Sequence, residues 1–297
     1  MSIEKNSENK EVPLPEPKKE TTEYEALVLS GGSSQGIVTL GAIQYAYDNF
    51  LLKNVTTYAG TSSGAMICYL LIIGFTPVEI IVYICTNQLM EKMQHFNIVA
   101  MMQGRGATSY HQLQDHLEKM TINKLGYLPT MNDLYEKHGK ALVCATHNLT
   151  EGCTEYISHE THPTVPCLTA LRMSANLPLV FESYKYGNSF YVDGGVSDNF
   201  PIHFRDIPKQ RTLGILLGPE KTGFEGKPET NTLEFIYKLM FVPVHQATEH
   251  KIQEASDSCR IVRLAYDKVR FFDFSVNSKD KLDMFTSGYQ QMENAIA

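Results

Sequence analysis

The five residues 60–64, Gly-Thr-Ser-Ser-Gly, place the tightest constraint on how this chain of 297 residues can fold. They follow a short strand-like run, residues 54–59, and lead directly into an apolar run with the character of a buried helix. Glycines two residues before and two residues after a serine, where a strand gives way to a helix, are typical of a nucleophile elbow, in which a sharp turn pushes the hydroxyl outward. Of the two serines in these five residues, only Ser62 has a glycine at both positions, so the pattern predicts Ser62 as a nucleophile, supported by Gly60 and Gly64.

A second glycine-rich turn lies upstream, between a strand-like run, residues 24–30, and a helical pattern that begins at Ile37. Such a loop presents several backbone N–H groups to an anion at the start of a helix. A P-loop would end in Gly-Lys-Ser or Gly-Lys-Thr, which this loop does not. A short-chain dehydrogenase would need a glycine in place of Val38 and a Tyr four residues before a Lys, and the chain has no such Tyr. Two interpretations remain, a simple tight turn or an oxyanion hole. The N–H groups available for such a hole belong to Gly31, Gly32, Ser33, Ser34 and Gly36.

Asp193 is the candidate general base. It ends a strand-like run, residues 189–192, and is followed by Gly194 and Gly195, which allow another backbone to approach closely. A carboxylate at the end of a strand can reach along the sheet edge toward the candidate nucleophile. Asp-Gly also begins many hairpin turns, but residues 196–201 have the composition of a loop and not of a partner strand, which weakens that interpretation.

Strand-like and helical patterns alternate along the chain without a break in composition. Helices are predicted over residues 76–93, 109–120, 165–174 and 232–256 and from residue 279, and strands over residues 140–146, 154–157, 189–192, 212–217 and 259–264. This alternation predicts one α/β/α domain over residues 24–297. Residues 1–23 are rich in Glu, Lys and Pro and are predicted to be a disordered tail.

The net charge of −7 argues against nucleic acid as the main partner, because binding by counterion release needs a concentrated basic face. The six cysteines form no CxxC pair and have no histidine at zinc spacing, which indicates reduced thiols and no metal site, and nothing in the chain calls for a cofactor. No apolar signal segment follows Met1, and the most hydrophobic stretch, residues 65–85, is interrupted at 74–77, so two buried helices are expected and no transmembrane helix. These features predict a cytoplasmic protein.

Two features leave a peripheral contact with membranes open. Basic residues near the C-terminus could dock on a membrane surface, although such a run is more often simply solvated; they are Arg260, Arg263, Lys268 and Arg270. Methionines before a glycine-flanked hinge at residues 103–106 are typical of a lid that touches lipid or, more commonly, of gap-filling core. We expect core for these methionines, among them Met90, Met93, Met101 and Met102.

Four stretches taken together resemble the patatin-like phospholipase family. They are the loop at 31–36, the elbow at 60–64, residues 168–181 (Leu-Thr-Ala-Leu-Arg-Met-Ser-Ala-Asn-Leu-Pro-Leu-Val-Phe) and residues 193–201 (Asp-Gly-Gly-Val-Ser-Asp-Asn-Phe-Pro). They occur in the family's order and span about residues 24–217. The resemblance implies a central, mostly parallel sheet and a Ser62–Asp193 dyad that acts on acyl esters of lipids without calcium. The loop departs from the family pattern twice, with Ser33 in place of the third glycine and Gln35 in place of the usual Lys or Arg.

The predicted function is that of a lipid acyl hydrolase, either a phospholipase of the A type or a lysophospholipase, acting on phospholipids or other acyl-ester lipids. Asp193 would take the proton of Ser62, the N–H groups of Gly32 and Ser33 would hold the oxyanion, and water would release the acyl group from the serine. One alternative is an ordinary hydrolase triad that adds His203, His245 or His250. Another is a catalytically weak scaffold that binds lipid or protein, suggested by the two departures in the loop.

Overall fold

The computed structural model describes residues 23–87, 89, 97–103, 106–205, 207–218, 232–267 and 276–296. Apart from Glu23, the predicted disordered tail lies outside the described residues, as do Met90, Met93, Lys268 and Arg270.

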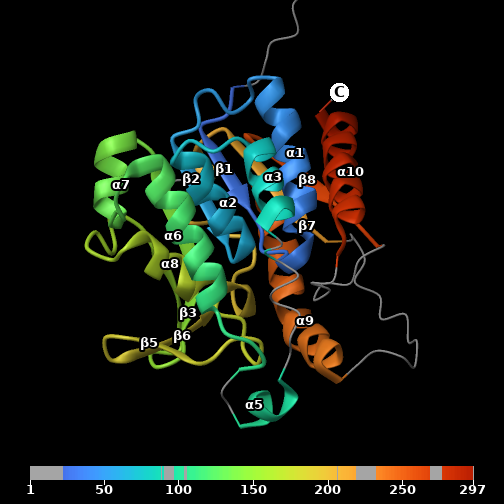
Figure 1. Cartoon of the computed structure of the whole chain (residues 1–297). Coiled ribbons are helices and arrows are strands. Elements are labelled where there is room, and N and C mark those ends of the chain that lie inside the picture. Colours follow the sequence, from blue (N-terminus) through green and yellow to red (C-terminus); the bar gives the residue numbers. More distant parts are fainter. Residues whose placement is uncertain are drawn as a thin grey trace, which may run out of the picture.

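In the described part of the chain, an eight-stranded sheet has the order β5-β6-β3-β2-β1-β7-β8, with β4 added to β3 (Figure 1). The parallel strands are β1 (Ala26–Leu29), β2 (Thr57–Thr61), β3 (Ala141–Asn148), β7 (Thr212–Leu217) and β8 (Cys259–Leu264). Antiparallel pairing adds β4 (Cys153–Ile157), β5 (Tyr184–Tyr186) and β6 (Ser189–Asp193) beside β3. The carboxyl ends of β1, β2 and β3 meet at one edge of the sheet, which is where sites form in folds of this class.

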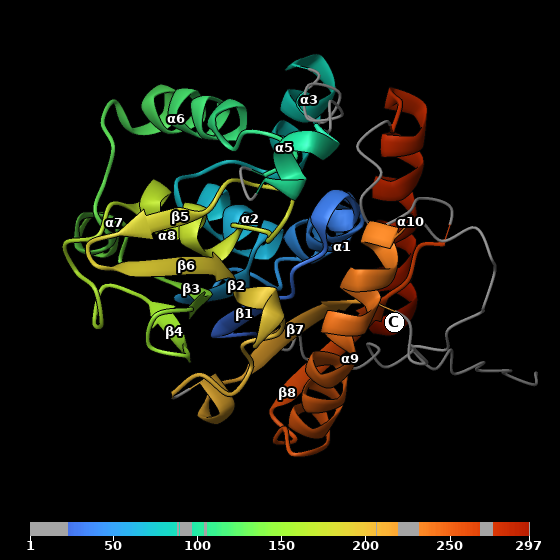
Figure 2. The same ribbon diagram turned by 90° about the horizontal axis from the view of Figure 1, so that it is seen from below.

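Helices lie on both faces of the sheet (Figure 2). They are α1 (Gly36–Asp48), α2 (Ser63–Ile72), α3 (Pro77–Asn87), α5 (Ile98–Met102), α6 (His111–Leu125), α7 (Met131–His138), α8 (Cys167–Ser174), α9 (Thr232–Gln253) and α10 (Ser278–Ile296). The larger apolar cluster joins one face of the sheet to α1, α2 and α8. A smaller cluster lies on the other face, where Phe200, Ile202, Ile207 and Ile252 of α9 pack with Val28, Ala59 and Val143. The predicted α/β/α sandwich with a mostly parallel central sheet is confirmed, with a thinner second layer.

The hydrophobic stretch at 65–85 forms α2 and α3, as predicted. Thr76 caps α3, because its hydroxyl accepts the N–H of Glu79 and the Glu79 carboxylate accepts the N–H of Thr76. Among the described residues, no single helix has both the length and the apolarity to cross a membrane; α2 and α3 reach them only as a pair, bent by 118°.

Candidate active site

Ser62 occupies a strained turn between β2 and α2. Its φ of 54° and ψ of −123° are a backbone conformation that residues other than glycine rarely adopt. A Cβ on Gly60 would lie 2.6 Å from the backbone nitrogen of Ala65, and one on Gly64 would lie 2.6 Å from the carbonyl oxygen of Ser30. Both positions therefore exclude side chains, as the elbow pattern requires.

Two long-range hydrogen bonds hold this turn in place. The backbone N–H of Ser62 donates to Oγ of Ser174 at 3.0 Å, and that hydroxyl donates to the carbonyl of Ala145 on β3 at 2.6 Å. The hydroxyl of Thr61 donates to the carbonyl of Asp198 at 2.9 Å. Ser174 ends α8, so the stretch at 168–181 positions the elbow, a role that the sequence pattern alone does not disclose.

Asp193 lies at the end of β6 and is 1% exposed. Its Oδ1 accepts the N–H of Gly195 at 2.7 Å. Burial raises the pKa of Asp193 from 3.8 to about 7, although interaction with the Ser62 hydroxyl and the Gly195 N–H opposes the rise. Oδ2, the other oxygen of this carboxyl, has no hydrogen-bond partner among the described residues. The contact between Asp193 and Ser62 is therefore looser than an ordinary hydrogen bond. Bonds of this kind often shorten when substrate binds, so Ser62 and Asp193 are neighbours that can exchange a proton.

The chain turns into the 3-10 helix η2 (Gly194–Val196) directly after Asp193 and forms no second strand there. A Cβ on Gly194 would lie 2.3 Å from the carbonyl oxygen of Ala145, so this glycine allows the base-bearing loop to pack against β3. The hairpin interpretation of Asp-Gly is therefore wrong. β6 does belong to a hairpin, but with β5, which precedes it.

The glycine loop lies beside the elbow, and two of its N–H groups already have acceptors. Gly31 donates to the carbonyl of Asn199 at 3.2 Å, and Gly32 donates to Oγ of Ser63 at 3.0 Å. Ser33 has a φ of 48°, a left-handed conformation that favours glycine and explains the glycine usual at this position. The Ser33 hydroxyl has no partner among the described residues.

Two side chains fix this loop from outside. Nδ2 of Asn199 donates to the carbonyl of Gly31 at 3.3 Å, so one segment, residues 193–201, carries the base and holds the loop. Nε2 of Gln35 donates to the carbonyl of Tyr266 at 3.0 Å, after β8. The amide that replaces the family's cation therefore anchors the loop to the rest of the fold.

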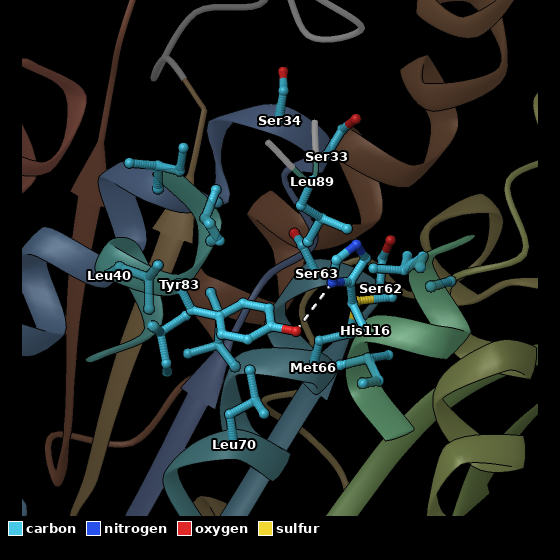
Figure 3. A pocket seen from close by; sticks show the side chains of 18 of the residues that line it. Ser33, Ser34, Leu40, Ser62, Ser63, Met66, Leu70, Tyr83, Leu89 and His116 are labelled. Carbon is cyan, nitrogen blue, oxygen red and sulfur yellow. Dashed lines mark hydrogen bonds between the residues drawn. The ribbon is translucent and has the colours of Figure 1, made fainter. Parts of the chain in front are cut away.

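Ser62 and Ser63 line an apolar pocket (Figure 3). Figure 3 shows these two serines near the loop that carries Ser33 and Ser34, with Leu70 at the other end of the view. The apolar walls of the pocket come from α1, α2, α3 and α6. They include Ile37, Leu40, Met66, Ile67, Leu70, Ile80, Ile84, Leu113, Leu117 and Met120. Within these walls the Tyr83 hydroxyl and Nδ1 of His116 form a hydrogen bond of 3.0 Å.

None of the three histidines proposed for a triad is hydrogen-bonded to Ser62 or Asp193 within the described residues. Burial lowers the pKa of His245, which lies on α9 near Glu249 and Arg263. His116 lies in no recognisable sequence motif, yet it lines the same pocket as Ser62. Within the described residues, no group of three or more His, Cys, Asp or Glu side chains could hold a metal ion.

The chain is similar in sequence to several known proteins. The family model described as Patatin-like phospholipase matches residues 27–205, which include the loop, the elbow and Asp193. "Probable lipid hydrolase 463L" of Invertebrate iridescent virus 6 is 35% identical over 185 residues, which cover 60% of this chain and 62% of that protein. "Uncharacterized protein YqhO" of Bacillus subtilis (strain 168) is 27% identical over 291 residues, covering 90% of this chain and 96% of that protein.

The fold also resembles a solved structure, VipD from Legionella pneumophila. The TM-score is 0.55 at 18% identity, and the match covers 92% of this chain and 67% of that one. At this identity the likeness concerns the fold alone.

Proposed function

The chain belongs to the patatin-like phospholipase family, a family of lipid hydrolases, and from this premise we propose that it cleaves carboxylic acyl esters of phospholipids or lysophospholipids through Ser62 and Asp193. The observation that carries the proposal is a serine on a strained elbow beside a buried carboxyl with a pKa of about 7, at the head of an apolar pocket. A serine hydroxyl needs a base to become a nucleophile, and an acid group that titrates near neutral pH suits that task.

The proposed reaction has two steps. As Oγ of Ser62 attacks the ester carbonyl, Asp193 accepts the hydroxyl proton and then passes it to the departing alcohol oxygen, which leaves the acyl group on Ser62. Water then attacks the acyl-enzyme, Asp193 again accepts a proton, and the proton returns to Ser62 as the fatty acid leaves. No metal ion takes part in these steps, so we propose that the activity does not depend on calcium.

The proposed oxyanion site differs from the sequence-based one in a single donor. The N–H of Ser33 has no acceptor among the described residues, but that of Gly32 is bound to Oγ of Ser63. Because this hydroxyl accepts from Gly32, its own hydrogen is available to an oxygen in the pocket, and bonds in such a chain strengthen one another. We assign the Ser33 N–H and the Ser63 hydroxyl as oxyanion donors, with Gly32 behind Ser63.

Replacing Ser63 by alanine is expected to lower kcat by about a hundredfold, since that is the usual effect of removing one oxyanion donor. KM for the ester should change by less than about threefold, because the donor acts on the developing charge and not on bound substrate. Steady-state kinetics on a soluble ester would measure both. An unchanged or higher kcat would mean that the Ser63 hydroxyl only blocks the Gly32 N–H.

A histidine scan distinguishes the dyad from a triad. His203→Ala, His245→Ala, His250→Ala and His116→Phe should each retain kcat within about tenfold of the wild type, because a triad histidine typically contributes about 10⁴-fold or more. His116→Phe can change KM for long acyl chains, because this side chain lines the pocket. A loss of about 10⁴-fold in any one variant would replace the dyad by a triad.

The direct test is release of fatty acid from phospholipids, lysophospholipids and neutral glycerides, with and without EDTA, by the full chain. We expect hydrolysis of at least one phospholipid class that EDTA does not reduce. Covalent labelling by a fluorophosphonate, located on Ser62 by mass spectrometry, would argue against the binding-scaffold alternative. Absence of both labelling and fatty acid release would refute the enzymatic proposal.

A further inference from the structure

The first half of α9 presents an apolar stripe to solvent. Its exposed members recur at the spacing of one helical face; they are Phe235, Ile236, Leu239 and Val242. Leu239 is 63% exposed. The same face continues with the exposed Gln246 and His250, whereas Val244 and Thr248 are buried on the opposite side. The exposed face therefore changes from apolar to polar near Pro243.

The short helix α5 adds two exposed apolar side chains, Val99 and Met102, and Met102 is 81% exposed. The expectation that this methionine fills the core is thus wrong. Backbone hydrogen bonds link α5 to the pocket, since Asn97 donates to Ala107 at 2.7 Å and Ala107 donates to Leu179 at 2.9 Å. Leu179 lies between Leu177 and Phe181, which both line the pocket, so these bonds join α5 to a segment that forms part of the pocket wall.

The inner face of α9 lies against the catalytic loop. A Cβ on Gly195 would be 3.2 Å from the ring of Phe241, and Gly195 is the residue whose N–H binds Asp193. Figure 1 shows α5 and the beginning of α9 at the same end of the molecule. Figure 2 views this end directly, and the start of α1, next to the oxyanion loop, lies between them. Helices α5 and α9 therefore border the site on two sides.

We propose that these two helices form a docking surface that inserts into the outer layer of a lipid bilayer; it consists of Val99, Met102, Phe235, Ile236, Leu239 and Val242. The proposal rests on the proposed function, in which the substrate is a bilayer lipid. Large exposed apolar surfaces mark protein or membrane contacts, and a half-exposed amphipathic helix suits the bilayer interface. A protein seated on both helices would lie across the site that they border, whereas a bilayer supplies acyl chains to it. All six side chains are uncharged, and the net charge of the chain is −7, so electrostatic attraction to lipid headgroups is not the source of binding. Attachment is by burial of these apolar side chains.

The chain contains no tryptophan, so one introduced tryptophan reports on one position. Leu239→Trp in a Ser62→Ala background, mixed with phosphatidylcholine vesicles, should show a blue-shifted emission and quenching by brominated acyl chains. Gln246→Trp, on the polar half of the same face, should show neither. The affinity should change by less than about twofold between 0.1 and 0.5 M NaCl, because screening weakens charge contacts and not apolar ones. An unshifted Leu239→Trp spectrum, or equal responses at both positions, would overturn the proposal.

A second pair of variants ties docking to turnover. Leu239→Asp should lower hydrolysis of vesicle lipid at least tenfold and leave hydrolysis of a soluble short-chain ester unchanged, whereas Gln246→Asp should change neither. An equal loss on both substrates would mean that Leu239 supports the catalytic fold and not docking. If the wild type hydrolyses no ester at all, the proposed function fails, while the tryptophan experiment still decides whether the surface binds a bilayer.

Discussion

Asp193→Asn is expected to lower kcat on a soluble ester by about a thousandfold or more, and to stabilise the fold at alkaline pH. Asparagine can still accept the Gly195 N–H that Oδ1 accepts at 2.7 Å, but it cannot take the proton of Ser62. General base catalysis typically contributes about 10²–10⁴-fold, and here no second base is hydrogen-bonded to the serine among the described residues. In the wild type, kcat/KM should fall about tenfold per pH unit below pH 7, because only the ionised carboxyl of Asp193 can act as the base.

The stability effect follows from the raised pKa of the same carboxyl. The folded protein holds the Asp193 proton up to about pH 7, whereas an ordinary aspartate releases it near pH 3.8. The protonated Asp193 therefore adds to the free energy of unfolding, relative to the ionised form. This added stability is full below about pH 4 and is lost as the pH rises toward 7. Above pH 7 the folded state carries the whole cost of an ionised, buried group, up to about 4 kcal/mol at about 1.4 kcal/mol per pKa unit.

Thermal unfolding at several pH values would measure this cost. The difference in Tm between Asp193→Asn and the wild type should increase from pH 4 to pH 7 and then level off in favour of the variant. Asp283→Asn, at an exposed position of α10, serves as the control and should change the unfolding free energy by less than about 0.5 kcal/mol. An Asp193→Asn variant that is less stable than the wild type at pH 8 would show that the ionised carboxyl is not costly.

The sequence predicted those parts of the fold and of the candidate site that depend on neighbours along the chain. The start of α3 is one example, because Thr76 and Glu79 cap each other within one turn. Gly60 is another, since a side chain there would meet Gly64 and Ala65 within the same turn. Gly64 differs, because a side chain there would meet the backbone of Leu29 and Ser30, which are distant in the sequence. The end of α6 was missed by five residues, although a local signal existed in Gly126, which ends the helix in a left-handed conformation.

The contacts that complete the site join residues far apart in the chain. Ser174 is 112 residues from Ser62, and Asn199 is 168 residues from Gly31, so only the folded structure pairs them. The bond between Gly32 and Ser63 has the same character and alters the predicted set of oxyanion donors. Exposure is equally non-local. The methionine pattern around Met102 suits a core or a surface, and only the folded structure shows that Met102 is exposed.

Both Ser62→Ala and Ser62→Gly are expected to lower kcat by about 10⁴-fold or more, because each removes the attacking hydroxyl. Their stabilities should differ, however. At a φ of 54° and ψ of −123°, alanine retains the steric strain of serine, whereas glycine has no Cβ and adopts this conformation readily. Such strain costs about 1–3 kcal/mol, and the greater flexibility of glycine in the unfolded chain offsets only part of the gain.

We therefore expect Ser62→Gly to be more stable than Ser62→Ala by about 1 kcal/mol, or roughly 2–4 °C in Tm. The same pair of substitutions at Thr286, which is exposed on α10, provides a control of opposite sign, because glycine in a helix interior is about 1 kcal/mol less favourable than alanine. If glycine were also the less stable residue at position 62, the elbow would store no strain and its geometry would follow from packing alone. If Ser62→Gly is the more stable variant, the turn is strained in the wild type, and this strained conformation is what keeps the Ser62 hydroxyl facing the pocket. The hydrogen bonds to Ser174 and Asp198 then hold the turn in that conformation.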